Sequence, residues 1–563
     1  MASTVTAVTD RAAGLVRLVP PALHMTLART LPRVASRALP ALSAPERLLV
    51  APPVIEPGDP ARGAELYAGR FALARLLVDA DGRSIFEVPP PSADWAAALA
   101  GFAWLGDLAA AGTSLAQVHA RALVTDWLSR RPPRIGRRPE VAARRLIAWL
   151  AWSRFLLEGA DTRFVRRFLR AVATESRTLR ATAWRASAGL PRLTVAVALA
   201  EAALAMAVPP GQLRRRLALL TAELERQILP DGGHISRNPA ALIELLLLLL
   251  PLREACVARQ VEPPAVLLGA LDRMLPMLRF FRHGDGAFAL FNGMGTTQPA
   301  LVEAILGFDD AAGRPVLNAP HSGYQRLESR SGLVVIADTG APLPTAVSAA
   351  AHAGALSFEL SLGRERVVVN CGASLRGDDA WRSAARSTAA HSTLGLDAVS
   401  SCRFLGGRLA RLAGPLVLAG PSAIKVTRED GPAATTVRAA HDGYAARFGA
   451  LHERTLVASG DALDGFDRLV PAPGRTLADE EATLRFHLHP DVAARLGDDS
   501  RIVLIRTPGG RSLAFAAEGH PLALDESIHL ADPMGPRRSS QIVLRVRSGQ
   551  ASRLAWRFAL AEP

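Results

Sequence analysis

Three neighbouring stretches carry most of the information about the fold: AHAGALSFELSL at 351–362, RVVVNCG at 366–372 and WRSAARSTAAHSTLGL at 381–396. The first two are short apolar runs of strand length, bounded by small or turn-forming residues. The third contains two arginines, a histidine and several hydroxyl side chains. Together they predict short antiparallel strands followed by a polar loop.

The period-two pattern continues from about residue 317 to the end of the chain. It predicts further strands at 332–339, 483–488, 501–507, 512–517, 541–546 and 553–558. Many short strands separated by Gly, Pro or Asp are typical of an antiparallel β-sandwich. We therefore expect a β-sandwich domain over residues 320–563.

The part of the chain before residue 310 has a helical period instead, with apolar residues three and four positions apart. Helices are predicted at 115–130, 140–158, 163–173, 194–207, 212–228, 240–258 and 264–281. Each amphipathic helix must bury its apolar stripe on its neighbours, which favours paired helices in a ring or solenoid. We expect this helical domain over residues 51–310, with the junction at 309–320.

Charge and composition exclude several classes of protein. The chain has 563 residues and a formal net charge of +14, and its only lysine is Lys425. Arginine could bind acidic partners, but arginine without lysine is also typical of GC-rich genomes. Because the arginines are scattered and no nucleic-acid-binding motif is present, we expect no nucleic-acid partner. Three cysteines cannot form a disulfide framework.

Residues 1–50 form a basic N-terminal arm that is rich in arginine and interrupted by proline. Peripheral contact with a membrane surface is one interpretation of this arm. It lacks the uninterrupted apolar region of a secretory signal, which favours a cytoplasmic location. The longest apolar run, 245–250, is too short to span a bilayer.

The order of these motifs resembles the heparinase II/III family of polysaccharide lyases, in which an α/α toroid precedes an antiparallel β-sandwich. The stretch 351–362 resembles the family's HxHxDxxSF pattern, and 381–396 resembles its R…STxAHNT stretch. The helical half matches more diffusely through FAWLGDL at 102–108 and LERQILPDGGHISRNP at 224–239. The resemblance implies an incomplete helical ring and a location in the bacterial cell envelope or periplasm.

The resemblance also implies a reaction, β-elimination on an acidic, uronate-containing polysaccharide. That reaction needs a group that neutralises the uronate carboxylate, a base and an acid, but no cofactor. The alternative is a non-catalytic protein that keeps the fold and binds acidic glycans or has a structural role in the envelope. Departures from the family pattern suggest this alternative, because the helical half contains no tyrosine after Tyr67.

With that tyrosine missing, we expect a histidine to act as the base. The catalytic candidates are His234 as base, and His391 or Tyr324 as the acid that protonates the leaving oxygen. The candidate substrate-binding residues lie in polar loops of both halves: Arg237, Asn238, Arg282, His283, Arg382 and Arg386. We expect His234, Arg237, Asn238, Arg282, His283, His352, Arg386 and His391 to line one cleft.

A structural metal site is implied by the metal-containing relatives, where two histidines and an aspartate are the ligands. The matching residues are His352, Asn370 and His391. Ala350 and Gly354 stand where the family has a histidine and an acid. Since a neutral asparagine is a poor zinc ligand, the sequence argues against a divalent metal here.

Overall fold

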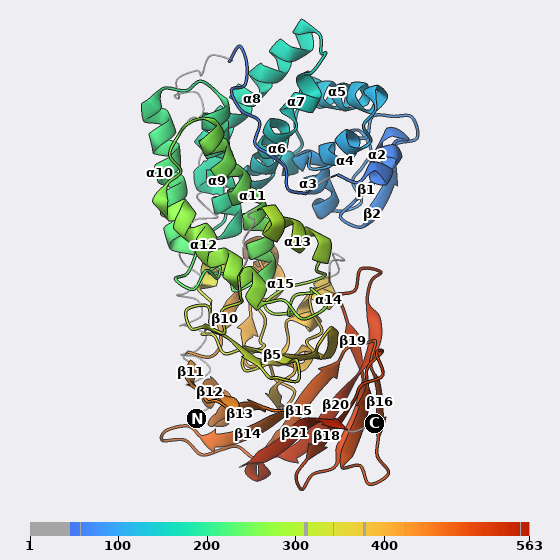
Figure 1. The fold of residues 1–563 in the computed structure, drawn as a ribbon, viewed down its shortest axis with the longest axis vertical. Coiled ribbons are helices and arrows are strands. Elements are labelled where there is room, and N and C mark those ends of the chain that lie inside the picture. Colours follow the sequence, from blue (N-terminus) through green and yellow to red (C-terminus); the bar gives the residue numbers. More distant parts are fainter. Residues whose placement is uncertain are drawn as a thin grey trace.

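The computed structural model describes residues 45–561, except 57, 309–312, 342, 375–378, 423 and 552. Helices occupy one end of the elongated molecule and strands the other (Figure 1). The expected order, a helical half followed by antiparallel sheets, is confirmed. The basic N-terminal arm lies outside the described residues as far as residue 44.

The helical half contains the predicted helices and several shorter ones. Its helices are α2 (Pro60–Tyr67), α3 (Ala93–Gly101), α4 (Leu105–Ala110), α5 (Ser114–Ser129), α6 (Pro139–Ala151), α7 (Ser153–Leu157), α8 (Thr162–Thr182), α9 (Leu190–Ala205), α10 (Pro210–Gln227), α11 (Pro239–Ala258), α12 (Ala265–Phe280) and α13 (Pro299–Phe308). A small hairpin, β1 (Arg70–Leu73) and β2 (Leu76–Asp79), which the sequence pattern did not predict, lies among them. The Trp95 indole N–H donates to the Leu76 carbonyl at 3.1 Å, which ties this hairpin to α3.

The helix starts follow from local side-chain chemistry. Ser92, Thr113 and Asp161 precede helices, and each accepts a hydrogen bond from a backbone N–H of the first turn. Such caps satisfy donors that have no partner within the helix. Alanine-rich α9 is buried on nearly all sides and packs against α6, α10 and α11, so it forms the centre of the helical half.

The sandwich consists of two large antiparallel sheets among the described strands. The first has the order β19 (Leu522–His529), β20 (Arg537–Arg547), β15 (Glu481–Leu488), β7 (Glu365–Val369), β6 (Phe358–Leu362), β5 (Leu333–Asp338), β4 (Tyr324–Glu328) and β3 (Asn318–Ala319), with β8 (Leu394–Leu396) also paired to β15. The second has the order β11 (Ile424–Asp430), β12 (Ala434–Tyr444), β13 (Ala450–Ser459), β14 (Ala462–Pro471), β21 (Leu554–Ala561), β18 (Ser512–Ala517), β17 (Ile502–Arg506) and β16 (Ala493–Leu496).

Aromatic side chains fill the space between the two sheets. The rings of Phe486 and Trp556 lie 4.8 Å apart at their centroids, and Phe515 and Phe558 pack beside them. On the outer face of the first sheet, Tyr324 belongs to the core of the helical half instead. The two halves therefore share a continuous apolar contact, which holds their loops in fixed relative positions.

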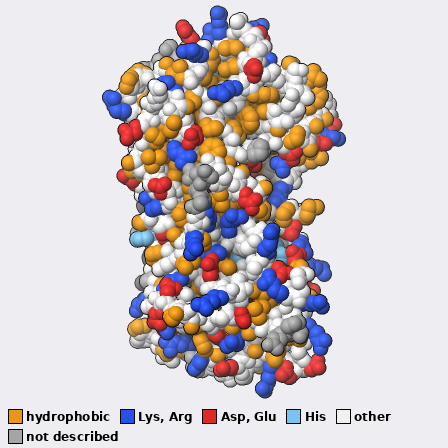
Figure 2. Space-filling view, viewed as in Figure 1, with side chains coloured by type: hydrophobic (Ala, Val, Ile, Leu, Met, Phe, Trp, Pro, Cys, Tyr) orange, Lys and Arg blue, Asp and Glu red, His pale blue; other side chains and the backbone are white. Residues whose placement is uncertain are grey.

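Charged side chains are spread over the surface. Lys and Arg side chains lie over both halves of the face shown in Figure 2, interspersed with Asp and Glu.

Within the described part of the chain, no helix combines the length and apolar character needed to cross a membrane.

Candidate functional site between the two halves

The loop between α10 and α11, residues 229–238, reaches from the helical half to the sandwich. Gly232 has a φ of +87°, and a Cβ there would lie 2.1 Å from the Arg273 carbonyl oxygen, so glycine is required. The Asp231 carboxylate accepts a hydrogen bond from the Ser322 backbone N–H at 2.6 Å. The Asp-Gly turn therefore joins this loop to the start of the sandwich.

His234 lies on this loop with its side chain buried and both ring nitrogens engaged. Nε2 lies 3.0 Å from Gln227 Oε1, and Nδ1 lies 2.7 Å from Ser236 Oγ. Since the amide oxygen of Gln227 can only accept, Nε2 carries the proton and Nδ1 accepts from Ser236. Burial lowers the pKa of His234 to about 4, so the ring is neutral at pH 7.

Arg237 crosses from the same loop into the sandwich. Its guanidinium forms an ion pair with Asp338 at the end of β5, and both side chains are buried. Its Nε donates to the Ser322 carbonyl at 2.6 Å. The guanidinium carbon also lies 4.7 Å from the centre of the Tyr324 ring, within the range of a cation–π contact. Arg237 is thus fully engaged by the protein itself.

Tyr324 is completely buried beside this ion pair. Its hydroxyl donates to the Arg237 carbonyl at 2.6 Å and accepts from Asn292 Nδ2 at 2.8 Å. Asn292 Nδ2 also donates to Asp338 at 3.2 Å. Burial raises the pKa of Tyr324 well above its ordinary value. The Tyr324 hydroxyl therefore takes part in the contact between the halves.

His352 and His391 lie in direct contact at the sandwich side of the site. His391 Nδ1 lies 2.8 Å from the Ser387 carbonyl oxygen and must donate to it, so Nε2 accepts from His352 Nδ1 at 3.1 Å. Burial lowers the pKa of both rings, and the nearby His391 and Arg386 lower that of His352 further. A Cβ on Gly354 would lie 2.6 Å from His391 Cδ2, so an acid at this position would collide with the ring.

Arg386 holds the loop that carries His352. Its Nε donates to the Ala351 carbonyl at 2.7 Å, its Nη2 donates to the Ser348 carbonyl at 3.2 Å, and it stacks over Phe404. Burial lowers the pKa of Arg386 to about 10. Arg382, in contrast, lies exposed on α14 (Asp379–Ala385). The two candidate arginines therefore have different environments, and Arg386 is committed to backbone carbonyls.

His283 belongs to a second buried contact between the halves. Its Nε2 lies 3.1 Å from Glu359 Oε2 on β6, and its Nδ1 lies 2.8 Å from Ser361 Oγ. The adjacent Arg282 turns away and pairs with the exposed Glu303 on α13. Asn238, which caps α11, uses its side-chain oxygen to accept from the Ala240 N–H at 2.9 Å.

The polar residues that do converge surround a small hollow. Its polar lining includes Arg237, Asn292, Asp338, His352 and Cys402. The hollow encloses about 390 Å³, part of which is open solvent, but the centre of a water molecule can occupy only about 30 Å³ of it. One bound water needs ~10–15 Å³ by this measure. The hollow therefore has room for about two waters.

The expected cleft is thus brought together only in part. Arg237, Tyr324, His352 and His391 are linked by direct contacts through Asn292 and Asp338, as the hydrogen bonds above describe. His283 lies in the separate contact with Glu359, while Arg282 and Arg382 lie towards the surface. The catalytic and substrate-binding roles of all these residues stay predictions.

Near His234, a side chain of the sandwich approaches the start of α9. A Cβ on Gly189, which begins α9 with a φ of +82°, would lie 3.1 Å from Val347 Cγ1 and 4.0 Å from His234 Cε1. Val347 comes from the 3₁₀ helix Thr345–Ala350. An apolar side chain of the sandwich therefore lies close to the N-terminal end of α9.

The metal site implied by the resemblance consists of His352, Asn370 and His391, and none of these side chains is anionic. Asn370 Oδ1 accepts from the Ser392 N–H at 3.0 Å, and Nδ2 has no partner among the described residues. His391 Nε2 and His352 Nδ1 are directed at each other. Within the described residues, no group of three or more His, Cys, Asp or Glu side chains could hold a metal ion.

Two acidic residues that join the halves, Asp338 and Glu359, were missed by the sequence analysis. Asp338 ends a strand of apolar residues, LVVIAD, and Glu359 interrupts another, FELSL. An acid within a buried strand needs a partner, because burying an unpaired charge is costly. That rule was a usable signal, although it does not identify Arg237 and His283 as the partners.

Comparisons with known proteins agree with this architecture. The model of the heparinase II/III-like C-terminal family matches residues 311–557. FtsZ-localized protein C of Caulobacter vibrioides is 33% identical over 540 residues, which cover 93% of this chain and 92% of the relative.

Solved lyase structures share the fold at low sequence identity. Heparinase III matches with a TM-score of 0.71 and 15% identity, covering 97% of this chain and 91% of that one. A mutant of the heparan sulfate lyase HepC of Pedobacter heparinus matches with a TM-score of 0.62 and 15% identity, covering 98% and 89%. The chain therefore has the α/α toroid and β-sandwich of a polysaccharide lyase fold.

Proposed function

Because the chain belongs to the heparinase II/III-like family, we propose that it uses the lyase fold as a non-catalytic binding scaffold and that it localises with FtsZ. The observation that carries the first part is the small size of the hollow between the halves, which has room for about two waters. The second part rests on the 33% identity to FtsZ-localized protein C over 93% of this chain.

The chemistry of β-elimination supports the non-catalytic proposal. The reaction needs a free cation to neutralise the uronate carboxylate, and a base and an acid that reach the sugar. Arg237 is already paired with Asp338, and the Tyr324 hydroxyl already donates to a backbone carbonyl. Both nitrogens of His234 are engaged and its side chain is buried. Each candidate would have to give up an internal partner before it could act.

Cleavage of an acidic, uronate-containing glycan is the second candidate function. One observation favours it: Arg237, Tyr324, His352 and His391 gather at the junction of the toroid and the sandwich. In this candidate, His234 removes the proton, His391 or Tyr324 protonates the leaving oxygen, and Arg237 neutralises the carboxylate after release from Asp338. Contact of residues 1–50 with a membrane surface also stays a prediction.

One assay distinguishes the two candidates. The purified full chain is incubated with a panel of uronate polysaccharides, and the ultraviolet absorbance of the new conjugated double bond is followed, with heparinase III on its own substrate as positive control. We expect no increase. A reproducible increase that falls by ~100-fold in His234→Ala, the scale for losing a general base, would establish the lyase instead.

Localisation with FtsZ needs a separate measurement. A fluorescent fusion of the full chain is imaged together with labelled FtsZ in the bacterium that encodes the chain. We expect the fusion to lie at the same positions as FtsZ before and during FtsZ depletion. When FtsZ is gone, the fusion should become diffuse. A diffuse signal in cells with normal FtsZ structures would refute this part and leave the scaffold proposal to the cleavage assay.

A further inference from the structure

A second hollow lies within the helical half, away from the junction with the sandwich. It is bounded by α8, α9 and α10, and each helix contributes residues one turn apart. The lining includes Ser176 and Arg180 from α8, Leu199 and Ala203 from α9, and Gln212 and Arg216 from α10. Since residues four apart share one face of a helix, two polar pairs flank an apolar floor.

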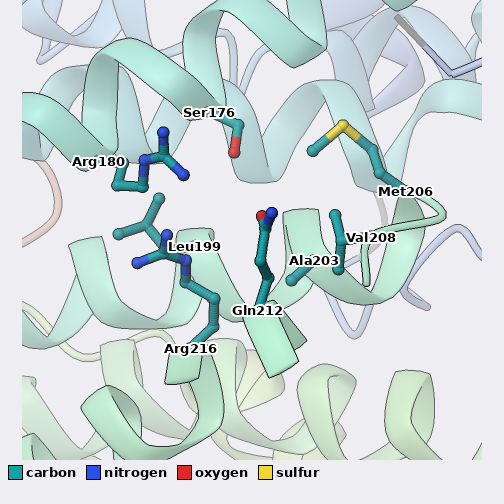
Figure 3. Close-up of a pocket in the computed structure, with 8 residues that line it drawn as sticks. All are labelled: Ser176, Arg180, Leu199, Ala203, Met206, Val208, Gln212 and Arg216. Carbon is teal, nitrogen blue, oxygen red and sulfur yellow. The ribbon is translucent and has the colours of Figure 1, made fainter. Parts of the chain in front are cut away.

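The polar ends of these four side chains point into the same space (Figure 3). The hydroxyl of Ser176 and the amide of Gln212 face each other across the hollow, and the guanidinium groups of Arg180 and Arg216 lie along one side. The hollow encloses about 290 Å³, including open solvent at its mouth. The centre of a water molecule can occupy only about 10 Å³ of it, so the hollow holds one small group at most and an oxyanion would enter with outward movement of the two long arginine side chains.

The two arginines have no internal partner. Within the part of the chain that the structure describes, neither makes an ion pair or a side-chain hydrogen bond. Nε and Nη2 of Arg180 are sealed from solvent and without acceptors. Burial lowers the pKa of Arg216, and the charges of Arg180 and Arg215 lower it further. Two like charges, partly desolvated and facing one space, are unfavourable unless something neutralises them.

We propose that Arg180 and Arg216, with Ser176 and Gln212, bind a tetrahedral oxyanion, a phosphate or sulfate group, in this hollow. Guanidinium groups match the oxygen geometry of phosphate and sulfate by donating two parallel hydrogen bonds. Ser176 and Gln212 add neutral donors from two facing sides, and a doubly charged anion balances two arginines. The proposal does not depend on the proposed function, because it concerns a different part of the fold.

The source of the oxyanion is either a free ion or an ester that presents the same group. A free ion would be held by the four polar side chains alone. An ester would also place its organic part at the open mouth, beside Met206 and Val208. Inorganic phosphate and glycerol 3-phosphate are therefore suitable probes for the two sources.

The test is a titration of the full chain at neutral pH in chloride of constant ionic strength. Inorganic phosphate, sulfate or glycerol 3-phosphate replaces part of the chloride, and the melting temperature is measured. Because a ligand that binds only the folded state stabilises it, we expect the melting temperature to rise and then level off as phosphate or sulfate is added. If the ligand is an ester, glycerol 3-phosphate should give this rise at a lower concentration. No rise with any of the three probes would overturn the proposal.

Variants assign the effect to this hollow. Arg180→Gln and Arg216→Gln each remove a charged donor, and their apparent affinity should fall by about 10-fold or more. Arg214→Gln is the matched control, because Arg214 lies exposed on α10 and outside the hollow. In chloride alone the two hollow variants should melt at the same temperature as the wild type or higher, since a like-charge contact is relieved.

If a glutamine variant does not fold, Arg180→Lys and Arg216→Lys take its place. They keep the charge but lose the planar pair of donors, so the response to phosphate should still weaken. An equal response in the wild type, the hollow variants and Arg214→Gln would mean a general salt effect and would refute the site.

Discussion

The guanidinium of Arg237, on the helical half, forms an ion pair with the carboxylate of Asp338 at the end of β5 in the sandwich. The side chains are 9% and 5% exposed, so water contributes little to solvating either charge. Tyr324 and Asn292 hold the pair from both sides. Arg237, which the sequence analysis assigned to substrate binding, therefore joins the two halves of the protein.

Removal of one partner of this pair should destabilise the protein strongly. Asp338→Ala leaves the Arg237 guanidinium buried without its counter-ion, which typically costs ~3–5 kcal/mol. The free energy of unfolding in urea measures the effect. Glu244→Ala is the control, because its pair with Arg144 also joins distant residues but has side chains 43% and 58% exposed. That pair should contribute less than about 1 kcal/mol.

Stability should fall as the solution is acidified below about pH 6.5, because buried histidines must become protonated on unfolding. Burial lowers the pKa of His529 to about 4, with Arg366 adding to the effect. The folded pKa is thus below the unfolded value, and stability present above pH 6.5 is lost as the pH falls towards 4.

His529→Phe removes one proton that is taken up on unfolding. The slope of the free energy of unfolding against pH should therefore fall by up to ~1.4 kcal/mol per pH unit between the two pKa values. Urea unfolding at several pH values gives the slope. His321→Phe, at an exposed position, is the control and should leave the slope unchanged. Equal slopes in both variants would contradict the assignment to His529.

Glu201 predicts the opposite pH dependence. It is buried in α9, its Oε2 has no hydrogen-bond partner, and burial raises its pKa to about 8. The folded state then binds a proton that the unfolded state has lost, so stability falls as the pH rises from about 4.5 to 8. Glu201→Gln should gain stability relative to wild type by up to ~1.4 kcal/mol per pH unit across this range. The exposed Glu262→Gln should show no such trend.

Zinc should have little effect on the wild type but should stabilise one variant. Asn370→Asp supplies the anionic side chain that the metal site implied by the family resemblance lacks, at a position where the wild type has an amide with Nδ2 unpartnered. Since a metal bound only by the folded state raises its stability, the melting temperature of the variant should rise with micromolar zinc and return with a chelator. Asn370→Ser, which adds no charge, is the control. A rise of equal size in wild type would show that the neutral set already suffices.

The order of helices and strands could be predicted from the sequence because each element shows its own period. The segment 212–228 matches α10, and 512–517 matches β18. Strands β11–β14 were not predicted. Strand β13, ALHERTLVAS, alternates between buried and half-buried positions, but alanine and charged residues give this alternation little contrast in hydrophobicity.

The sequence by itself also determined which residues would lie in loops near the junction, including Arg237, His352 and His391. Only the tertiary structure decided their partners, since Asp338 lies about a hundred residues from Arg237 and Glu359 lies 76 residues from His283. A motif records the type of a side chain, but whether an arginine meets a substrate or an internal carboxylate depends on how the two halves pack against each other. The hollow of Arg180 and Arg216 has the same origin, because three helices must pack together before two unpaired charges face one space.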